Sequence, residues 1–564
     1  MKLLPKKSWA VMLTLPLVVG LLISPVADAK PRPPVLPADP VFTNASVHDP
    51  DLVHVDGQYY AFGSHLAAAT SPDLMRWEGL ANGVTPENPL FDDVTTELKE
   101  TLDWAQSDTL WAPDVIKLAD GRFYMYYDAC KGDSPRSALG LAVADKVTGP
   151  YKDLGILLKS GMWDLPSEDG TIYDARVHPN TVDPDVFFDA QGKLWMVYGS
   201  YSGGIFILSL DPATGKPFPN QGYGKHLMGG NHARIEGPAV MYNPKTRYYY
   251  LFMTFGGLDA NGGYNIRVAR SRKPDGPYLD ASGTDMATVK ADPSKPLFDD
   301  ASIQPYGTKV MGNYLFQRVV GDPGTGIGTG YVSPGGTSPV YDRATGRQFL
   351  AMHTRFPGRG EEHEIRVHQM YTNAGGWPVV APFRYGGETL SKIDRGDMVG
   401  AYAYINHGKA ISADITRATD IRLNRNGTVS GAVTGRWRKI GRNDAQLIIG
   451  GRSYSTVFSR QWEPSTASWV VTFSGLSREG VAVWGAHRTL VGDAEVVRRV
   501  VTDLRLPATT IADLSLPTTG TQGSTIRWAT SNASVISATG KVNRPQAGED
   551  DATVTSRPPS PAAP

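Results

Sequence analysis

Three short stretches of the chain place a carboxylate beside a proline that opens an apolar, strand-like run. The stretches are His48–Val53, Val182–Phe187 and Ile235–Val240. A single Asp-Pro pair commonly starts a turn and carries little information. An aromatic-rich run follows each stretch, however, namely Gln58–Ser64, Lys193–Ser200 and Arg247–Thr254. The repetition indicates one structural unit used several times, with acids at equivalent places.

Two further copies of the unit lack the acid before the proline. One begins at Trp111–Ile116 and continues with Arg122–Asp128, and the other begins at Thr337–Tyr341 and continues with Arg347–Thr354. Repeats of several short strands separated by glycine and proline turns are typical of a β-propeller or a similar radial array. We therefore expect an all-β fold with five units in residues 41–388.

The positions of the prolines predict where the acids lie. Proline has no N–H, so within a sheet it is tolerated at the first residue of a strand. In a propeller the first strand of each blade lines the central channel, and we expect Asp49, Asp183 and Glu236 to converge at one end of it. The second strand returns to the same rim. It should bring the side chains at its end close to the acids, namely Ser64, Asp128, Ser200, Thr254 and His353.

Three acids that converge at one point form an active-site pattern. Hydrolysis with inversion uses one carboxylic acid to protonate the leaving oxygen and one carboxylate to activate water, about 6.5–9.5 Å apart. A third carboxylate beside the acid would raise its pKa, because a nearby like charge disfavours ionisation. The alternative is that these acids only cap turns at strand entrances, which explains one such acid more readily than three in phase.

Composition limits the function without naming it. The 564 residues contain 56 basic and 56 acidic side chains, and this balance argues against nucleic acid as a partner. The hydrophobic fraction of 41% is sufficient for large buried cores. Cys130 is the single cysteine, so an intramolecular disulfide is impossible and stability must come from packing or a metal.

The N-terminus predicts secretion. Lys2, Lys6 and Lys7 precede an apolar run from Trp9 to Ile23, and small residues follow at Ala27 and Ala29. This pattern indicates a secretory signal peptide over residues 1–29. A proline-rich leader occupies residues 30–40, and we expect no membrane span elsewhere.

Beyond the repeats, residues 389–490 contain short strand-like runs joined by Asn-Gly and glycine-rich turns, which predict an antiparallel β-barrel or sandwich. Its role remains open between packing against the propeller and binding sugar. Residues 497–564 are similar to a bacterial immunoglobulin-like module. The proline-rich end of this module cannot supply a final strand, so we expect an incomplete module with a disordered tail.

The repeated motifs resemble those of glycoside hydrolase family 43. The segments 48–51, 111–115, 182–185 and 234–238 match its signature, and 131–137, 229–234, 353–356 and 361–364 resemble secreted bacterial endo-α-1,5-L-arabinanases. The resemblance implies a five-bladed propeller and an inverting glycosidase, with Asp49 as base, Glu236 as acid and Asp183 beside the acid. One departure is that Gly335–Ser338 reads Gly-Gly-Thr-Ser where Gly-His-Asn-Ser is expected.

The same resemblance implies further site residues. A histidine in the context of His353 helps to hold a central calcium ion, although calcium prefers oxygen ligands and a hydrogen-bonded channel histidine is the alternative. The candidate substrate-binding residues are Asn180, Ser200, Tyr201, Ser202, His232, Gly132 and Trp111. For each of these, a role in stabilising loops or the core is the competing interpretation.

The sequence therefore predicts a secreted hydrolase that cleaves internal α-1,5-L-arabinofuranosidic bonds of arabinan in plant cell-wall pectin. One alternative is an exo-acting α-L-arabinofuranosidase or β-xylosidase of the same family. Another, of a different class, is a non-catalytic propeller that binds polysaccharide. The expected partners are arabinan and arabino-oligosaccharides, and we expect a monomer.

Overall fold

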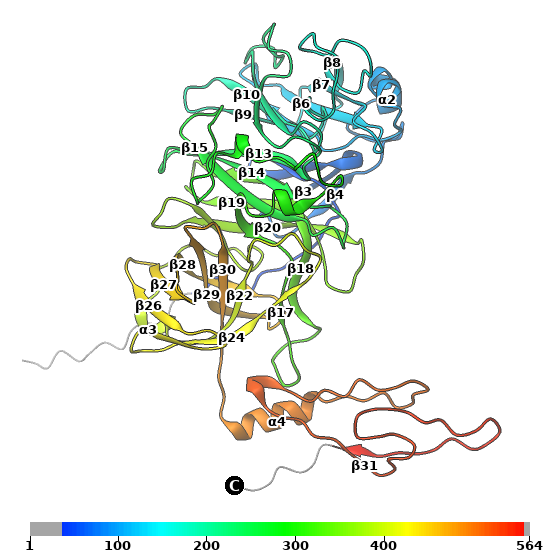
Figure 1. Cartoon of the computed structure of the whole chain (residues 1–564), viewed down its shortest axis with the longest axis vertical. Helices are drawn as coiled ribbons and strands as arrows, with labels where there is room; N and C mark the ends of the chain where they lie inside the picture. Colours follow the sequence, from blue (N-terminus) through cyan, green and yellow to red (C-terminus); the bar gives the residue numbers. More distant parts are fainter. Residues whose placement is uncertain (1–35, 558–564) are drawn as a thin grey trace, which may run out of the picture. The chain divides into compact units, whose positions relative to one another are not determined.

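Five antiparallel blades of four strands follow one another along the chain, each built from one continuous segment (Figure 1), and the sheet of the last blade is extended to six strands by β17 (Tyr314–Gln317) and β23 (Thr416–Arg417). The computed structural model describes residues 36–557, so the expected signal peptide and the last seven residues lie outside it. The first two blades are β1 (Asp51–Val55), β2 (Gln58–Gly63), β3 (Ala67–Ser71) and β4 (Glu78–Ala81), then β5 (Asp114–Lys117), β6 (Phe123–Cys130), β7 (Ser137–Ala144) and β8 (Lys152–Lys159).

The next three blades repeat this order. They are β9 (Asp185–Phe188), β10 (Leu194–Tyr198), β11 (Ile205–Leu210) and β12 (Lys225–Met228); β13 (Ile235–Asn243), β14 (Tyr248–Phe255), β15 (Asn265–Ser271) and β16 (Thr308–Met311); and β18 (Gly328–Tyr341), β19 (Gln348–Arg355), β20 (His363–Thr372) and β21 (Pro378–Val380). The protein is therefore a five-bladed β-propeller, as the repeats and the family resemblance predict. Two short helices, α1 (Val94–Glu97) and α2 (Lys99–Ala105), follow the first blade.

The inner strands of four of the five blades are preceded or interrupted by the same left-handed backbone position. Asp49 and Asp183 have φ of 47° and 55°, and Gly237 and Gly336 have φ of 56° and 54° at the corresponding points of later blades. Aspartate tolerates this left-handed region better than most residues. The acids of the first and third blades are therefore aimed by a strained turn just before β1 and β9.

Glu236 is positioned differently. It lies inside β13, opposite Thr254, and the register of β13 shifts between Glu236 and Ala239. A β-bulge of this kind bends the strand and re-aims a side chain. The Gly-Pro pair after Glu236 supplies the bulge, so the acid enters the channel one residue earlier than the two aspartates do.

A closed eight-stranded antiparallel barrel follows the propeller. Its strands are β22 (Gly400–Asn406), β24 (Thr419–Leu423), β25 (Thr428–Gly431), β26 (Gly435–Lys439), β27 (Asp444–Ile449), β28 (Arg452–Glu463), β29 (Ser468–Ser477) and β30 (Ala482–Arg488). β17 (Tyr314–Gln317) pairs with β18 and with β23 (Thr416–Arg417), and α3 (Arg395–Met398) precedes the barrel. One apolar core is shared by side chains of both domains, among them Tyr314, Phe383 and Trp484. The barrel therefore packs against the propeller.

The remaining described residues form the small C-terminal module. It contains helix α4 (Asp493–Asp503) and a two-stranded sheet of β31 (Ala529–Thr530) and β32 (Ser556–Arg557). Among the described residues, no helix is long and apolar enough to cross a membrane.

Candidate active site

The predicted acids gather at the channel of the propeller. A narrow space of about 40 Å³ is lined by the residues that begin the inner strands. Its carboxylates come from the first three blades, namely Asp49, Asp51, Asp114, Asp183 and Asp185. Glu236 precedes Gly237 in the same wall and interacts electrostatically with Asp49 and Asp183. The convergence expected from repeat phase is therefore present.

Asp49 is held in its ionised form. Its Oδ2 accepts a hydrogen bond from Ser64 Oγ at 2.8 Å and lies 2.7 Å from His48 Nδ1, while His353 Nδ1 lies 3.3 Å from Oδ1. Burial raises the pKa of Asp49, but the His48 charge and the hydrogen bonds to His353 and His48 outweigh it, so the pKa lies well below its usual value. A carboxylate that stays ionised is suited to accept a proton.

Glu236 and Asp183 show the opposite behaviour. Burial raises the pKa of Glu236, although Ser200 Oγ donates to its Oε2 at 2.7 Å. Burial and then the charge of Glu236 raise the pKa of Asp183 well above its usual value, and Gly237 N–H donates to Asp183 Oδ2 at 3.1 Å. Two such carboxyls retain a proton between them. Environments that push carboxyl pKa values apart separate an acid from a base.

A second layer of side chains ties each inner strand to the next. Val115 N–H donates to Asp51 Oδ2 and Val240 N–H donates to Asp185 Oδ2, each at 3.0 Å. Asp114 is related in the same way to Val186 N–H, which lowers its pKa against the larger effect of burial. In the last blade Ser338 Oγ takes this place and accepts Leu52 N–H at 3.0 Å.

The one exception to this second layer has a simple chemical reason. The equivalent side chain in the fourth blade is Ala239, which cannot accept a hydrogen bond, and the backbone it would face belongs to Pro339, which has no N–H. The acceptor is missing where the donor is missing. These second-layer acids therefore belong to a structural ring below the catalytic layer.

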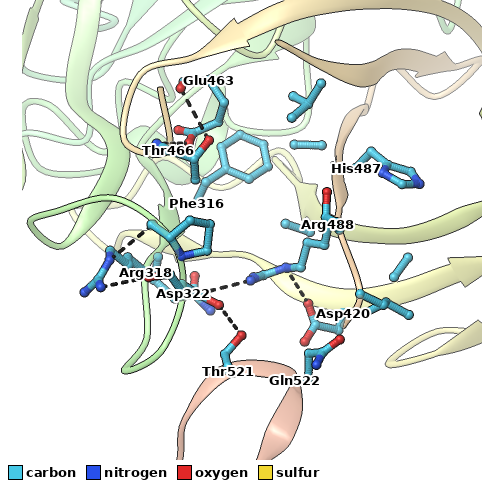
Figure 2. A pocket seen from close by; sticks show the side chains of 18 of the residues that line it. Phe316, Arg318, Asp322, Asp420, Glu463, Thr466, His487, Arg488, Thr521 and Gln522 are labelled. Carbon is cyan, nitrogen blue, oxygen red and sulfur yellow. Dashed lines mark hydrogen bonds and ion pairs between the residues drawn. The ribbon is translucent and has the colours of Figure 1, made fainter. Parts of the chain in front are cut away.

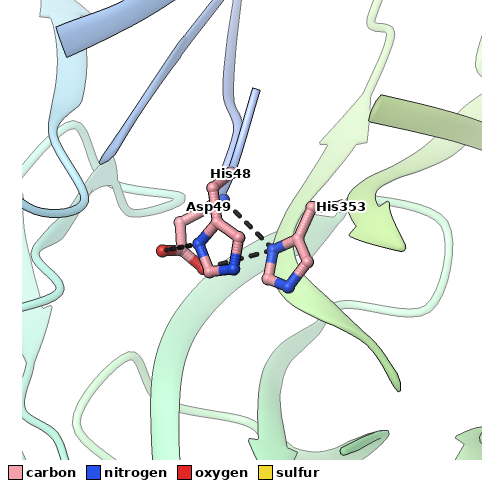
Figure 3. A group of neighbouring side chains, drawn as sticks. All are labelled: His48, Asp49 and His353. Carbon is pink, nitrogen blue, oxygen red and sulfur yellow. Dashed lines mark hydrogen bonds and ion pairs between the residues drawn. The ribbon is translucent and has the colours of Figure 1, made fainter. Parts of the chain in front are cut away.

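His48 and His353 flank Asp49 (Figure 3). Their rings stack with centroids 3.6 Å apart, and His353 Nδ1 lies 3.1 Å from the Asp49 backbone nitrogen and 3.3 Å from Asp49 Oδ1. One ligand atom from each of His48, Asp49 and His353 lies within 4.8 Å of the others, the arrangement of a possible metal site. His353 Nε2 is fully buried and lacks a hydrogen-bond partner within residues 36–557. A buried nitrogen of this kind requires a partner.

The expected substrate-binding residues divide into two groups. Ser200, Tyr201, Ser202 and His232 lie beside the strand that carries Glu236, because Tyr201 N–H donates to Ile235 O and His232 N–H donates to Ser202 O. In the second group, Asn180 is buried, and its Oδ1 accepts a hydrogen bond from Ser137 Oγ at 2.5 Å. Asn180 is thereby engaged within the protein.

Trp111 and Gly132 lie close to one another near the second blade. A Cβ on Gly132 would be 3.8 Å from Trp111 Cζ2, and Trp111 N–H donates to Asp128 O at 2.9 Å. Trp111 is half-buried, so part of its ring faces solvent. Asp128 itself is fully buried, and burial raises its pKa well above its usual value.

Two elements of the site escaped the sequence reasoning. Tyr264 lies against Glu236, and an ion pair joins Arg234 to Asp300. Both Tyr264 and Asp300 belong to long connections outside the repeat phase. The second-layer acids, in contrast, carry a readable signal, because Asp51, Asp114 and Asp185 each follow the repeated proline directly.

A larger cavity of about 410 Å³ lies away from these acids (Figure 2). It is lined by barrel strands, by the chain around β17 and by the turn Thr521–Gly523. Its charged groups pair with one another: Arg488 contacts Asp322 and Asp420, and Thr521 Oγ1 donates to Asp322 at 2.5 Å. These pairs fasten segments of the chain together and leave the channel as the better candidate for chemistry.

Comparison with known proteins assigns the class. The profile of glycosyl hydrolases family 43 matches residues 38–302, a C-terminal lipocalin-like domain matches 382–485, and an atrophied bacterial Ig domain matches 493–556. The chain belongs to glycoside hydrolase family 43. Its fold also matches a solved family 43 protein from Bacillus licheniformis at 59% identity with a TM-score of 0.77, covering 80% of this chain and 100% of that one.

Two curated relatives narrow the class. The extracellular endo-α-(1→5)-L-arabinanase 2 of Bacillus subtilis is 59% identical over 447 residues, covering 79% of this chain and 94% of the relative. The extracellular endo-α-(1→5)-L-arabinanase of Thermotoga petrophila is 50% identical over 453 residues with the same two coverages. A solved endo-1,5-α-L-arabinanase from Thermotoga petrophila superposes with a TM-score of 0.76 at 49% identity, covering 80% of this chain and 100% of that one.

Proposed function

We propose that this protein is a secreted endo-α-1,5-L-arabinanase that cleaves arabinan chains of plant pectin internally with inversion. The observation that carries the proposal is the opposite electrostatic environment of Asp49 and Glu236 in one channel. Relatives that share half or more of their residues with this chain bear the name of that activity. Their description as extracellular supports secretion, and their names support arabinan and arabino-oligosaccharides as substrates of a monomeric enzyme.

The proposed reaction uses the two carboxyls in complementary roles. Asp49, ionised and fixed by Ser64 and His48, removes a proton from a water molecule that attacks the anomeric carbon. Glu236, which keeps its proton, gives it to the departing glycosidic oxygen. Asp183 lies beside Glu236 and favours its protonated form, because two adjacent carboxylates repel each other.

We further propose that a calcium ion binds in the channel at His353. The supporting observation is the buried Nε2 of His353, which lacks a partner among residues 36–557 and lies beside a channel wall rich in carboxylates. This nitrogen can act as a ligand in the tautomer whose Nδ1–H is directed to Asp49 Oδ1, 3.3 Å away. The ion would supply positive charge that offsets the repulsion between these acids. A side chain at Gly336 is excluded, since its Cβ would lie 2.2 Å from Asp49 Oδ1 and 2.8 Å from His353 Nδ1. His353 and His48 are then the histidines that line the candidate metal site.

The product profile on debranched arabinan tests the proposed activity. An endo enzyme releases a mixture of oligomers of several lengths at early times, whereas an exo-acting arabinofuranosidase releases a single small product. Release of xylose from β-xylosides instead of arabinose products would indicate the β-xylosidase alternative. Binding of arabinan without any hydrolysis would contradict the enzyme assignment and favour a non-catalytic propeller. Polarimetry or NMR of the first-formed anomer tests inversion.

A further inference from the structure

Tyr264 lies at the centre of the site although no repeat motif contains it. It ends the connection between β14 and β15 and is 2% exposed. The connection is closed on itself, because Gly257 N–H donates to Gly262 O at 2.9 Å and Gly257 bridges to Gly263. This closed loop delivers the tyrosine ring into the channel wall at a fixed place.

Packing against the last blade fixes the ring further. Its centroid lies 5.9 Å from that of His353, with 20° between the ring planes. Gly335, the strand partner of His353, comes so close that an added Cβ would be 2.0 Å from Tyr264 Cε1. The bare glycine of the Gly-Gly-Thr-Ser segment therefore makes room for the ring.

The Tyr264 ring lies beside the strand pair that carries Glu236, because a Cβ added to Gly335 would be 2.0 Å from Tyr264 Cε1 and 2.7 Å from Cγ2 of Thr254, the residue opposite Glu236. A hydrogen bond from Tyr264 lowers the pKa of Glu236 against the larger effect of burial. A tyrosine phenol ordinarily has a pKa of about 10, so it carries its proton at neutral pH. A phenol that keeps its proton acts as a donor toward a carboxylate. Ser200 Oγ is the second donor to the same carboxyl.

We infer that Tyr264 is a positioning residue for the catalytic acid: its hydroxyl holds the Glu236 carboxyl toward the channel and stabilises the carboxylate that remains after proton delivery. This inference deepens the proposed glycosidase function and rests on it. In the step concerned, the proton of Glu236 passes to the glycosidic oxygen as the bond from that oxygen to the anomeric carbon breaks. Water supplies hydroxide to the carbon and its proton passes to Asp49.

A stack of three aromatic rings links the catalytic base to the catalytic acid. His48 contacts the base Asp49, stacks on His353, and His353 stacks on Tyr264, which reaches the acid. The groups that face Glu236 are Asp49 and His48 before β1, Asp183 before β9, Tyr201 after β10, and Tyr264. Of these, Tyr264 faces the carboxyl as a neutral donor and favours its ionised form.

The test is Tyr264→Phe, which keeps the ring and removes the donor. A hydrogen bond to a charged group contributes enough that kcat on arabinan should fall about tenfold to a hundredfold with KM little changed. The basic limb of the pH–rate profile should move to higher pH, because Glu236 loses a group that stabilises its ionised form. On an arabino-oligosaccharide with an acidic phenol as leaving group the loss should shrink to less than about threefold, since such a group departs without strong protonation.

Two controls separate this role from a structural one. Tyr151→Phe removes another fully buried hydroxyl, bonded to Val147 O at 2.9 Å in the second blade, and should leave both readouts unchanged. Gly335→Ala should displace the Tyr264 ring and reproduce the leaving-group signature, whereas Gly79→Ala, where an added Cβ has open space, should not. The glycine pair keeps the inference testable if Tyr264→Phe does not fold.

The outcomes are distinct. An equal loss on both substrates with an unmoved basic limb would overturn the inference and leave Tyr264 as a packing residue. If the unchanged protein does not hydrolyse arabinan, or Glu236→Gln is fully active, the proposed function fails first. An active parent, an inactive Glu236→Gln and a Tyr264→Phe variant with parental kinetics would refute the role of Tyr264 alone.

Discussion

Glu388 lies where the propeller meets the barrel, and its carboxyl is 2% exposed. Its Oε2 accepts Gly386 N–H at 2.7 Å and its Oε1 accepts Gln461 Nε2 at 3.1 Å. Burial raises the pKa of Glu388 from 4.5 to about 7, against the effect of these donors. The carboxyl is therefore expected to make stability depend on pH.

The sign follows from proton linkage. Below pH 4.5 both the folded and the unfolded state bind the proton, and burial carries no ionic penalty. Between 4.5 and about 7 the unfolded state releases the proton while the folded state keeps it, so stability falls as pH rises. At 1.36 kcal/mol for each pKa unit, the full penalty above pH 7 is about 3 kcal/mol.

Glu388→Gln removes the charge but also one acceptor, because an amide has a single oxygen to serve Gly386 and Gln461. The lost hydrogen bond costs about 1–2 kcal/mol at every pH. The melting temperature of the variant should then lie below that of the parent at pH 5 and above it at pH 9. Differential scanning calorimetry of both proteins across this range measures the difference.

A matched variant of opposite sign is Glu364→Gln. Burial raises the pKa of Glu364, but Arg366 and Arg359 lower it by more, so the net pKa lies below its usual value. The contribution of Glu364 to folding stability is therefore present at neutral pH and lost in acid. This variant should be less stable than the parent at pH 7, and the deficit should shrink toward pH 3. A difference between Glu388→Gln and the parent that stays constant from pH 5 to pH 9 would refute the reasoning.

Three further outcomes are expected. Glu236→Gln and Asp49→Asn should each abolish hydrolysis while circular dichroism and the melting temperature stay near those of the parent; near-normal turnover by either would exclude its assigned role. Asp183→Asn should lower activity strongly and move the basic limb of the pH–rate profile to lower pH, because the two carboxyls share a proton and Glu236 without Asp183 titrates alone. An unmoved limb would leave Asp183 with an orienting role only. Chelation should lower activity, melting temperature or both, and His353→Ala should mimic it; indifference to chelator and to added calcium would contradict the calcium proposal.

The repeat phase of the sequence was sufficient to predict the five blades and the meeting of the acids. It worked because proline fixes the start of each inner strand, and strand direction then fixes which ends share a rim. The bulge at Glu236 was not predictable in this way. The sequence places a glycine between the acid and its proline, but only the pairing of β13 with β14 shows that the strand absorbs the extra residue.

Residues outside the repeat were the ones missed. Tyr264 reaches Glu236 from a loop whose length differs from blade to blade, and long-range packing against His353 and Gly335 places it there. No local pattern encodes such a contact. The hydrogen bonds of the second layer could in principle be predicted from the sequence, since Ala239 and Pro339 depart from the pattern together. Recognising them requires knowing which inner strands are neighbours.

Each blade consists of one continuous segment, and within residues 36–557 the first and the last blade exchange no strand. Side chains and isolated backbone contacts close the ring instead: Leu52 N–H donates to Ser338 Oγ, Ile365 N–H donates to Ala45 O at 3.0 Å, and Arg384 donates to Asn44 at 3.1 Å. Opening the ring at this seam leaves every sheet intact. The order of the blades along the chain is therefore not fixed by strand pairing. A circular permutant of residues 41–388 that joins this seam and begins at another blade is expected to keep the same hydrogen bonds within each blade.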